Sequence, residues 1–91
     1  MAFVVKFKPE GFTAAKYQET IKKLEAAGAG APKGRTFHVS YGDANGVDIT
    51  DVWDSMEDFQ AFGQTLIPIM KSLGVDTGTP DVQQIFGIVK G

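Results

Sequence analysis

The chain has 91 residues, enough for one domain and too few for two, so we expect a single domain over residues 1–91. Nine basic and eleven acidic residues give a net charge of −2, and the lysines are scattered, which argues against a nucleic-acid interface. The chain lacks cysteine and has one histidine, which excludes disulfides, thiol chemistry and a multi-histidine metal site within one chain, and we expect neither metal nor cofactor.

The N-terminal segment "MAFVVKFKPEGF" predicts a strand. Residues 2–7 are β-branched and aromatic, and Pro9 and Gly11 follow as turn residues. The apolar run is too short, with lysines inside it, for a signal peptide, and no stretch approaches the length of a membrane span. We therefore expect a cytoplasmic protein without a membrane partner.

A first amphipathic helix is predicted over residues 13–27. Thr13 stands at the N-cap position, and Tyr17, Ile21 and Leu24 recur at helical spacing. Gly28 offers the conformation that ends a helix. These apolar side chains are therefore expected in the core.

A β-hairpin is predicted next. Residues 35–42, "RTFHVSYG", alternate with the period of a strand, and residues 47–54 read as its partner. Asn45 and Gly46 between them tolerate the positive φ angles of a type I′ turn. We expect these two residues to form the loop.

A second helix begins after Ser55, which is placed to cap it, with Asp58 three residues later. Apolar residues follow at helical spacing from Phe59 to Leu73. Pro68 lies inside this stretch and lacks the amide of a regular helix, so it is expected to kink or interrupt the helix. The segment 81–90 then predicts a fourth strand.

The order of these elements is β, α, β, β, α, β. This is the ferredoxin-like pattern of an α+β fold, in which both helices cover one face of a four-stranded antiparallel sheet. Right-handed crossovers place the first and third strands in the centre. The second sheet face is left uncovered.

Strand alternation sorts the hairpin side chains into two groups. With Asn45 and Gly46 as the loop, His38 lies opposite Trp53, and Ser40 lies opposite Asp51 on the same face. Thr36 joins them by alternation. The opposite face carries the more apolar group, which is Phe37, Val39, Tyr41, Thr50 and Val52. This apolar group is therefore assigned to the helix-packed core, and the histidine group to the uncovered face.

The stretch "VWDSMEDFQAF" resembles the "W-[DE]-S-x-x-x-F" signature of the dimeric α+β barrel proteins, and most of all the antibiotic-biosynthesis monooxygenase-like domains. The resemblance implies a homodimer closed by the two uncovered sheet faces, with a pocket between the sheet and the helices or loops. It also implies that some relatives oxidise polycyclic phenols or quinols without metal or flavin. Haem degradation, known in another branch, is not expected, because Phe62 and Ser72 stand where that branch has tryptophan and histidine.

The site hypothesis centres on His38 as a general base that Asp51 orients, since imidazole changes its charge near neutral pH. The alternative is a histidine packed into a dimer interface. The same alternative, packing in a core or interface, holds for the candidate substrate-binding residues, which are Trp53, Ser40, Thr36, Phe62, Leu66 and Met70.

Two functions follow from this interpretation. The first is a homodimeric barrel that binds an aromatic or hydrophobic small molecule and acts as a cofactor-independent monooxygenase or related enzyme. The second is a non-catalytic ligand-binding or assembly module, in which the same sheet face serves only as dimer interface.

Overall fold

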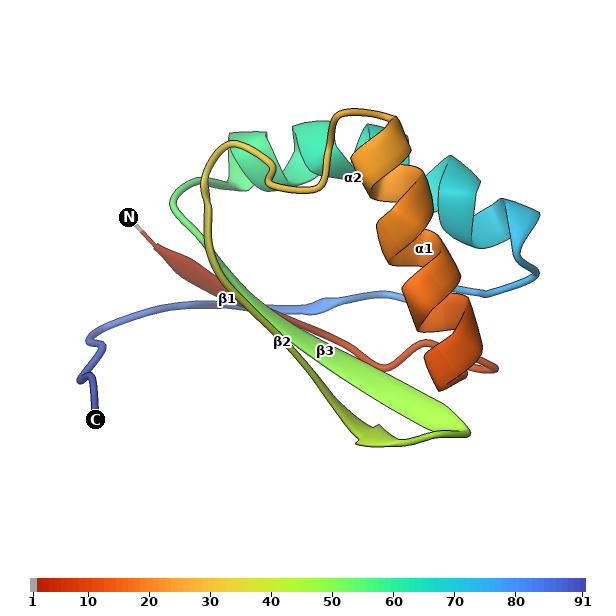
Figure 1. The fold of residues 1–91 in the computed structure, drawn as a ribbon. Helices are drawn as coiled ribbons and strands as arrows, with labels where there is room; N and C mark the ends of the chain where they lie inside the picture. The colour runs from red at the N-terminus through yellow and green to blue at the C-terminus, as the bar shows by residue number, and fades with distance from the viewer. Residues whose placement is uncertain (1) are drawn as a thin grey trace.

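A four-stranded antiparallel sheet carries two helices on one face in the computed structural model, which describes residues 2–91 (Figure 1). The strand order is β2-β3-β1-β4, with the first and third strands in the centre, as a ferredoxin-like fold requires. The predicted fold class is therefore confirmed. The elements are β1 (Phe3–Phe7), α1 (Ala14–Ala26), β2 (Arg35–Asp43), β3 (Gly46–Trp53), α2 (Met56–Ser72) and β4 (Asp81–Gln84).

Both helices begin at the predicted caps. The Thr13 hydroxyl accepts a hydrogen bond from the Lys16 amide at 3.2 Å, and the Ser55 hydroxyl accepts one from the Asp58 amide at 3.1 Å. Each bond satisfies an amide that the first helical turn leaves free. Within residues 2–91, neither helix is long and apolar enough to cross a membrane.

Two outcomes were predicted at Pro68, a kink or an interruption of the helix. Helix α2 runs through Pro68 to Ser72, so the interruption is wrong and the kink stays a prediction. The proline removes one backbone hydrogen bond. Leu66 and Met70 pack into the core on either side of it, and these contacts hold the two halves of the helix to the sheet. Tertiary packing here outweighs the local cost of the proline.

The hairpin turn differs from the predicted type I′ turn. Asp43 pairs with Gly46, which leaves Ala44 and Asn45 as the loop, and no described residue other than glycine has a positive φ angle. The Asp43 carboxylate accepts hydrogen bonds from the amides of Asn45 at 2.8 Å and Gly46 at 3.0 Å and so closes the turn. His38 consequently lies opposite Asp51 instead of Trp53.

The predicted grouping of hairpin side chains holds except for Thr36, which lies at an irregularity of β2, but its assignment to the two faces is wrong. The strands are displaced by two residues from the predicted register, and an even displacement keeps every side chain on its face. Trp53 and Asp51 are buried beneath the helices, whereas Phe37 is 56% exposed on the other face. The histidine group therefore faces the helices, and the more apolar group lies on the uncovered face.

A physical reason for this inversion lies in side-chain size and pairing. Trp53 is the largest fully buried side chain, and it forms one core with Val5, Phe7, Leu24 and Phe62. Large aromatic rings contribute most to a core. Asp51 tolerates burial because His38 is its hydrogen-bond partner.

The fourth strand is shorter than predicted and ends at Gln84 instead of residue 90. It pairs with β1, whose first residue in the ladder is Phe3, and one further bond joins the Ile85 amide to the Ala2 carbonyl at 2.9 Å. Beyond this point the chain leaves the sheet, as the blue C-terminal segment in Figure 1 shows. Phe86 and Val89 in this segment are exposed.

Candidate active site

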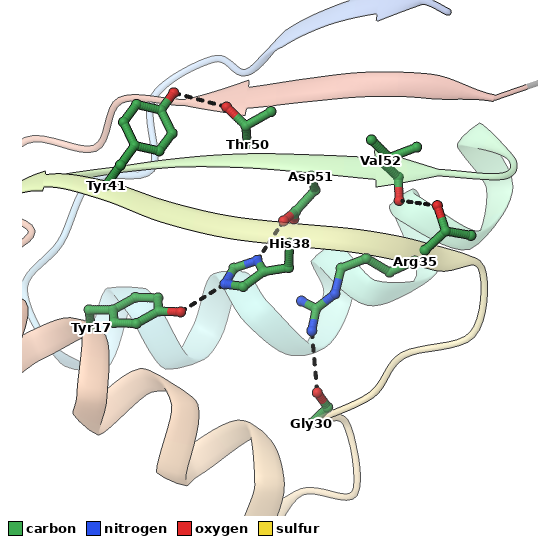
Figure 2. A network of polar contacts seen from close by, with 9 residues as sticks. Tyr17, Gly30, Arg35, His38, Tyr41, Thr50, Asp51 and Val52 are labelled. Atoms are coloured by element: carbon green, nitrogen blue, oxygen red, sulfur yellow. Dashed lines mark hydrogen bonds and ion pairs between the residues drawn. The ribbon is translucent and has the colours of Figure 1, made fainter. Parts of the chain in front are cut away.

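A chain of three polar side chains links α1 to the two hairpin strands (Figure 2). Nδ1 of His38 on β2 lies 2.5 Å from Oδ1 of Asp51 on β3, and Nε2 of His38 lies 2.8 Å from the Tyr17 hydroxyl on α1. The side chain of Asp51 is 3% exposed and that of His38 is 21% exposed. The order runs from a buried carboxylate through an imidazole to a phenol.

Strand register and helix position bring these groups together. His38 and Asp51 are direct cross-strand partners, and Tyr17 projects from the first half of α1 toward His38. The Phe12 ring meets the Tyr17 ring edge-on at a centroid distance of 5.9 Å, and the Tyr17 and His38 rings lie within 8° of parallel. The phenol is therefore held on one side by a buried ring and at its oxygen by the imidazole.

The three side chains line an apolar cavity between the sheet and the helices. The space between the lining atoms is about 450 Å³ with its open mouth included, and the part that can hold the centre of a water molecule is about 30 Å³. That part has room for only one or two water molecules. A larger ligand therefore requires lining side chains to move; the apolar ones include Phe12, Ile21, Leu24, Ile49, Phe62, Leu66 and Met70.

Arg35 brings a positive charge to the wall of this cavity. Its guanidinium lies 5.6 Å from the centre of the Phe62 ring and donates to the Gly30 carbonyl at 3.3 Å. A register shift between Arg35 and Phe37 marks a β-bulge, which places Arg35 opposite Trp53. A fixed cation at the wall favours a ligand that is or becomes anionic.

Phe62, Leu66 and Met70 of the predicted substrate-binding set lie in the cavity wall together with His38 and Asp51. They also belong to the core, so the packing role given as the alternative is present, and their substrate-binding role stays a prediction.

Trp53 does not line the cavity. It is fully buried against Phe59 and Phe62, at ring distances of 5.7 and 5.3 Å, and its indole nitrogen has no hydrogen-bond partner among the described residues. This environment gives the ring a core position, behind the Phe62 part of the cavity wall.

Ser40 and Thr36 do not contact the His38–Asp51 pair through a hydrogen bond and do not line the cavity. Ser40 is half-buried opposite Ile49 and is not part of the cavity wall. Thr36 lies at the bulge, where it is exposed, and its hydroxyl is 3.5 Å from the Val52 carbonyl. The bulge thus replaces Thr36 by Arg35 at the cavity, and the alternation from which Thr36 was predicted ends there.

Sequence patterns did not identify Tyr17 and Arg35 as site residues. The helical spacing of Tyr17 with Ile21 and Leu24 is that of a core residue. The feature that could have identified Tyr17 as a site residue is its hydroxyl, because a buried tyrosine usually directs its hydroxyl at a polar partner. Arg35 carries no comparable signal, since its position depends on the bulge.

The fold is that of antibiotic biosynthesis monooxygenase-like domains, and the resemblance seen in the sequence is confirmed at this level. A structure assigned to these monooxygenases from Chloroflexus aurantiacus J-10-fl has a TM-score of 0.65 at 15% identity and covers 99% of this chain and 98% of its own. SnoaB, a cofactor-independent oxygenase from Streptomyces nogalater, has a TM-score of 0.63 at 17% identity over 99% of this chain and 96% of its own.

A third structure, assigned to the same monooxygenases from Deinococcus radiodurans, has a TM-score of 0.63 at 13% identity and covers 99% of this chain and 97% of its own. No protein-family model matches the chain, and no curated protein matches it. These low identities make the similarity one of fold.

Proposed function

We propose that the protein is a cofactor-independent enzyme that removes a proton from an aromatic or similarly apolar small molecule, as the first step of an oxygenation or a related rearrangement. The observation that carries this proposal is the hydrogen bond between the buried Asp51 carboxylate and the half-buried His38 imidazole at the wall of an apolar cavity. A carboxylate that holds an imidazole in one orientation is a recurrent general-base arrangement. The fold shared with the cofactor-independent oxygenase SnoaB supports the proposal.

The geometry supports a definite division of roles. Asp51 accepts a hydrogen bond from the Nδ1–H group of His38 and stabilises the imidazolium that forms when His38 takes up a proton at Nε2. The anion left on the substrate then lies in a cavity whose wall includes the Arg35 guanidinium. An electron-rich aromatic anion of this kind can react with molecular oxygen, and a CH₂ group plus O₂ gives a carbonyl and one water.

Access to the cavity involves Leu66. Leu66, Phe7 and Thr77 also line a second depression, which runs along α2 past Gly63 and Pro68. The two spaces share these three side chains as a common wall. Rotation of Leu66 therefore offers a way to widen the narrow cavity toward the surface of α2.

The test is proton abstraction itself, measured without oxygen. Anthrone, a tricyclic aromatic ketone with an acidic CH₂ group, is incubated anaerobically in D₂O, and deuterium incorporation is followed by mass spectrometry. We expect the wild-type protein to accelerate exchange and His38→Gln to return it to the uncatalysed rate, because glutamine cannot act as a base. Equal exchange rates for the wild type and His38→Gln would contradict the proposed enzymatic function and favour the non-catalytic module.

We also propose that the protein is a homodimer through the uncovered sheet face. Phe37, Val39 and Tyr41 on β2 are 56%, 37% and 43% exposed, and strand alternation puts them on the face opposite His38 and the buried Asp51, which the helices leave bare. Apolar side chains gathered on one sheet face are typical of an interaction surface. The resemblance to dimeric α+β barrel proteins gives the second copy as the partner.

Val39→Asp is expected to convert the dimer into monomers, because it places a charge in the apolar interface. Native mass spectrometry at micromolar concentration measures the stoichiometry. Ile67→Asp is the matched control, since Ile67 is a β-branched residue, 51% exposed, on helix α2. A wild-type protein that is monomeric at this concentration would overturn the proposed dimer.

A further inference from the structure

Both ring nitrogens of His38 are already engaged, and the one that acts as a base faces a side chain of the same protein. Nε2 lies 2.8 Å from the Tyr17 hydroxyl, while Nδ1 lies against Asp51. We infer that Tyr17 is a catalytic residue whose phenol oxygen takes the substrate proton while its own proton passes to His38. This inference rests on the function proposed above and assigns the group that meets the substrate.

The chemistry of Asp51 decides which nitrogen of His38 carries the proton. An ionised carboxylate only accepts hydrogen bonds, so Nδ1 of a neutral His38 is protonated and Nε2 keeps its lone pair. The Tyr17 hydroxyl must then be the donor to Nε2. The basic lone pair of the imidazole consequently points at the phenol.

The position of Tyr17 makes its oxygen available to a ligand. Tyr17 lines the cavity, and its ring is held between Phe12 and the imidazole of His38. Donating its proton to Nε2 leaves the phenol oxygen free to accept a hydrogen bond from a substrate O–H or C–H group. A substrate can thus reach His38 through Tyr17 without displacing any side chain of the triad.

The proposed step is a transfer of two protons. The substrate X–H bond breaks, and its proton joins the Tyr17 oxygen as the Tyr17 O–H proton moves to Nε2 of His38. The products are the substrate anion, a neutral tyrosine and an imidazolium paired with the Asp51 carboxylate. No electron is transferred in this step, and its reversal returns a proton to the substrate.

Tyr17→Phe separates this role from packing, because it keeps the ring against Phe12 and removes only the hydroxyl. In the anaerobic anthrone exchange described above, we expect Tyr17→Phe to exchange about 100-fold more slowly than the wild type. This factor is the lower end of the range for removal of a general acid–base group. Ser72→Ala is the control: it removes an exposed hydroxyl at the end of α2, which donates to the Ile69 carbonyl at 2.6 Å and lies outside the cavity wall and the uncovered sheet face. Its exchange rate should equal that of the wild type.

The outcomes distinguish this inference from the proposed function. If Tyr17→Phe exchanges as fast as the wild type or faster while His38→Gln is inactive, His38 acts directly and the role of Tyr17 is overturned. If the wild type itself does not accelerate exchange, the proposed function fails.

A second measurement needs no substrate. The chain has one histidine, so the ¹⁵N chemical shifts of its ring report on His38 alone. At a pH where the ring is neutral, we expect an imine-type signal for Nε2 and a protonated Nδ1, with the Nε2 signal shifted in Tyr17→Phe. A proton on Nε2 in the wild type would overturn the relay, because Tyr17 could not then donate to it.

Discussion

We expect Asp51→Asn to slow the exchange of anthrone hydrogens about 10²- to 10⁴-fold, the range for general acid–base catalysis. The asparagine amide can donate to Nδ1 of His38, which moves the ring proton to Nε2. The basic lone pair is then turned away from Tyr17 and the cavity. The carboxylate that stabilises the imidazolium is lost at the same time, so both effects lower the exchange rate.

The exchange rate of Asp51→Asn is compared with that of Asp48→Asn, which changes a carboxylate of the same strand that pairs opposite Tyr41. The control is expected to exchange like the wild type. Urea unfolding checks the fold: asparagine keeps a hydrogen bond to His38, so the free energy of unfolding should change by no more than about 1 kcal/mol. A folded Asp51→Asn protein with the wild-type rate would contradict the assigned role of Asp51.

Trp53→Ala is expected to lower the free energy of unfolding by about 3 to 5 kcal/mol, as large aromatic-to-alanine changes in cores do. Trp53 is fully buried and packs against Phe59 and Phe62. Since folded domains are stable by about 5 to 15 kcal/mol, a loss of this size removes a large part of the total free energy of unfolding. The cavity residue Phe62 also loses its support.

Urea unfolding followed by far-ultraviolet circular dichroism measures this loss, because Trp53 is the only tryptophan and its removal abolishes that fluorescence signal. Trp53→Phe is the comparison. The indole nitrogen has no partner among the described residues, so phenylalanine forfeits no hydrogen bond and should be clearly more stable than alanine. A loss below about 1 kcal/mol for Trp53→Ala would contradict its place at the centre of the core.

Several features of the fold could be predicted because they depend on neighbouring residues. Thr13 and Ser55 cap their helices as predicted, since a cap needs only a side-chain oxygen beside the first turn. The hairpin was also predictable from its alternation. Its turn was not, because the Asp43 carboxylate competes with the positive-φ turn that Asn45 and Gly46 favour.

The candidate site was predictable in part for the same reason. Alternation placed His38 and Asp51 on the same face of the hairpin, and they still share a face because the predicted register is wrong by an even number of residues, two. Helical spacing placed Phe62 on the core side of α2. Tyr17 escaped prediction because its hydroxyl meets His38 only after α1 is folded over the sheet.

The sequence by itself determined the order of strands and helices, their caps and the grouping of hairpin side chains, because each depends on short-range periodicity. The tertiary structure alone decided which face the helices cover, the length of β4 and the exchange of Thr36 for Arg35 at the cavity. These depend on burial of Trp53, on the pairing available at the end of β1 and on a bulge. Interactions between distant segments govern all three.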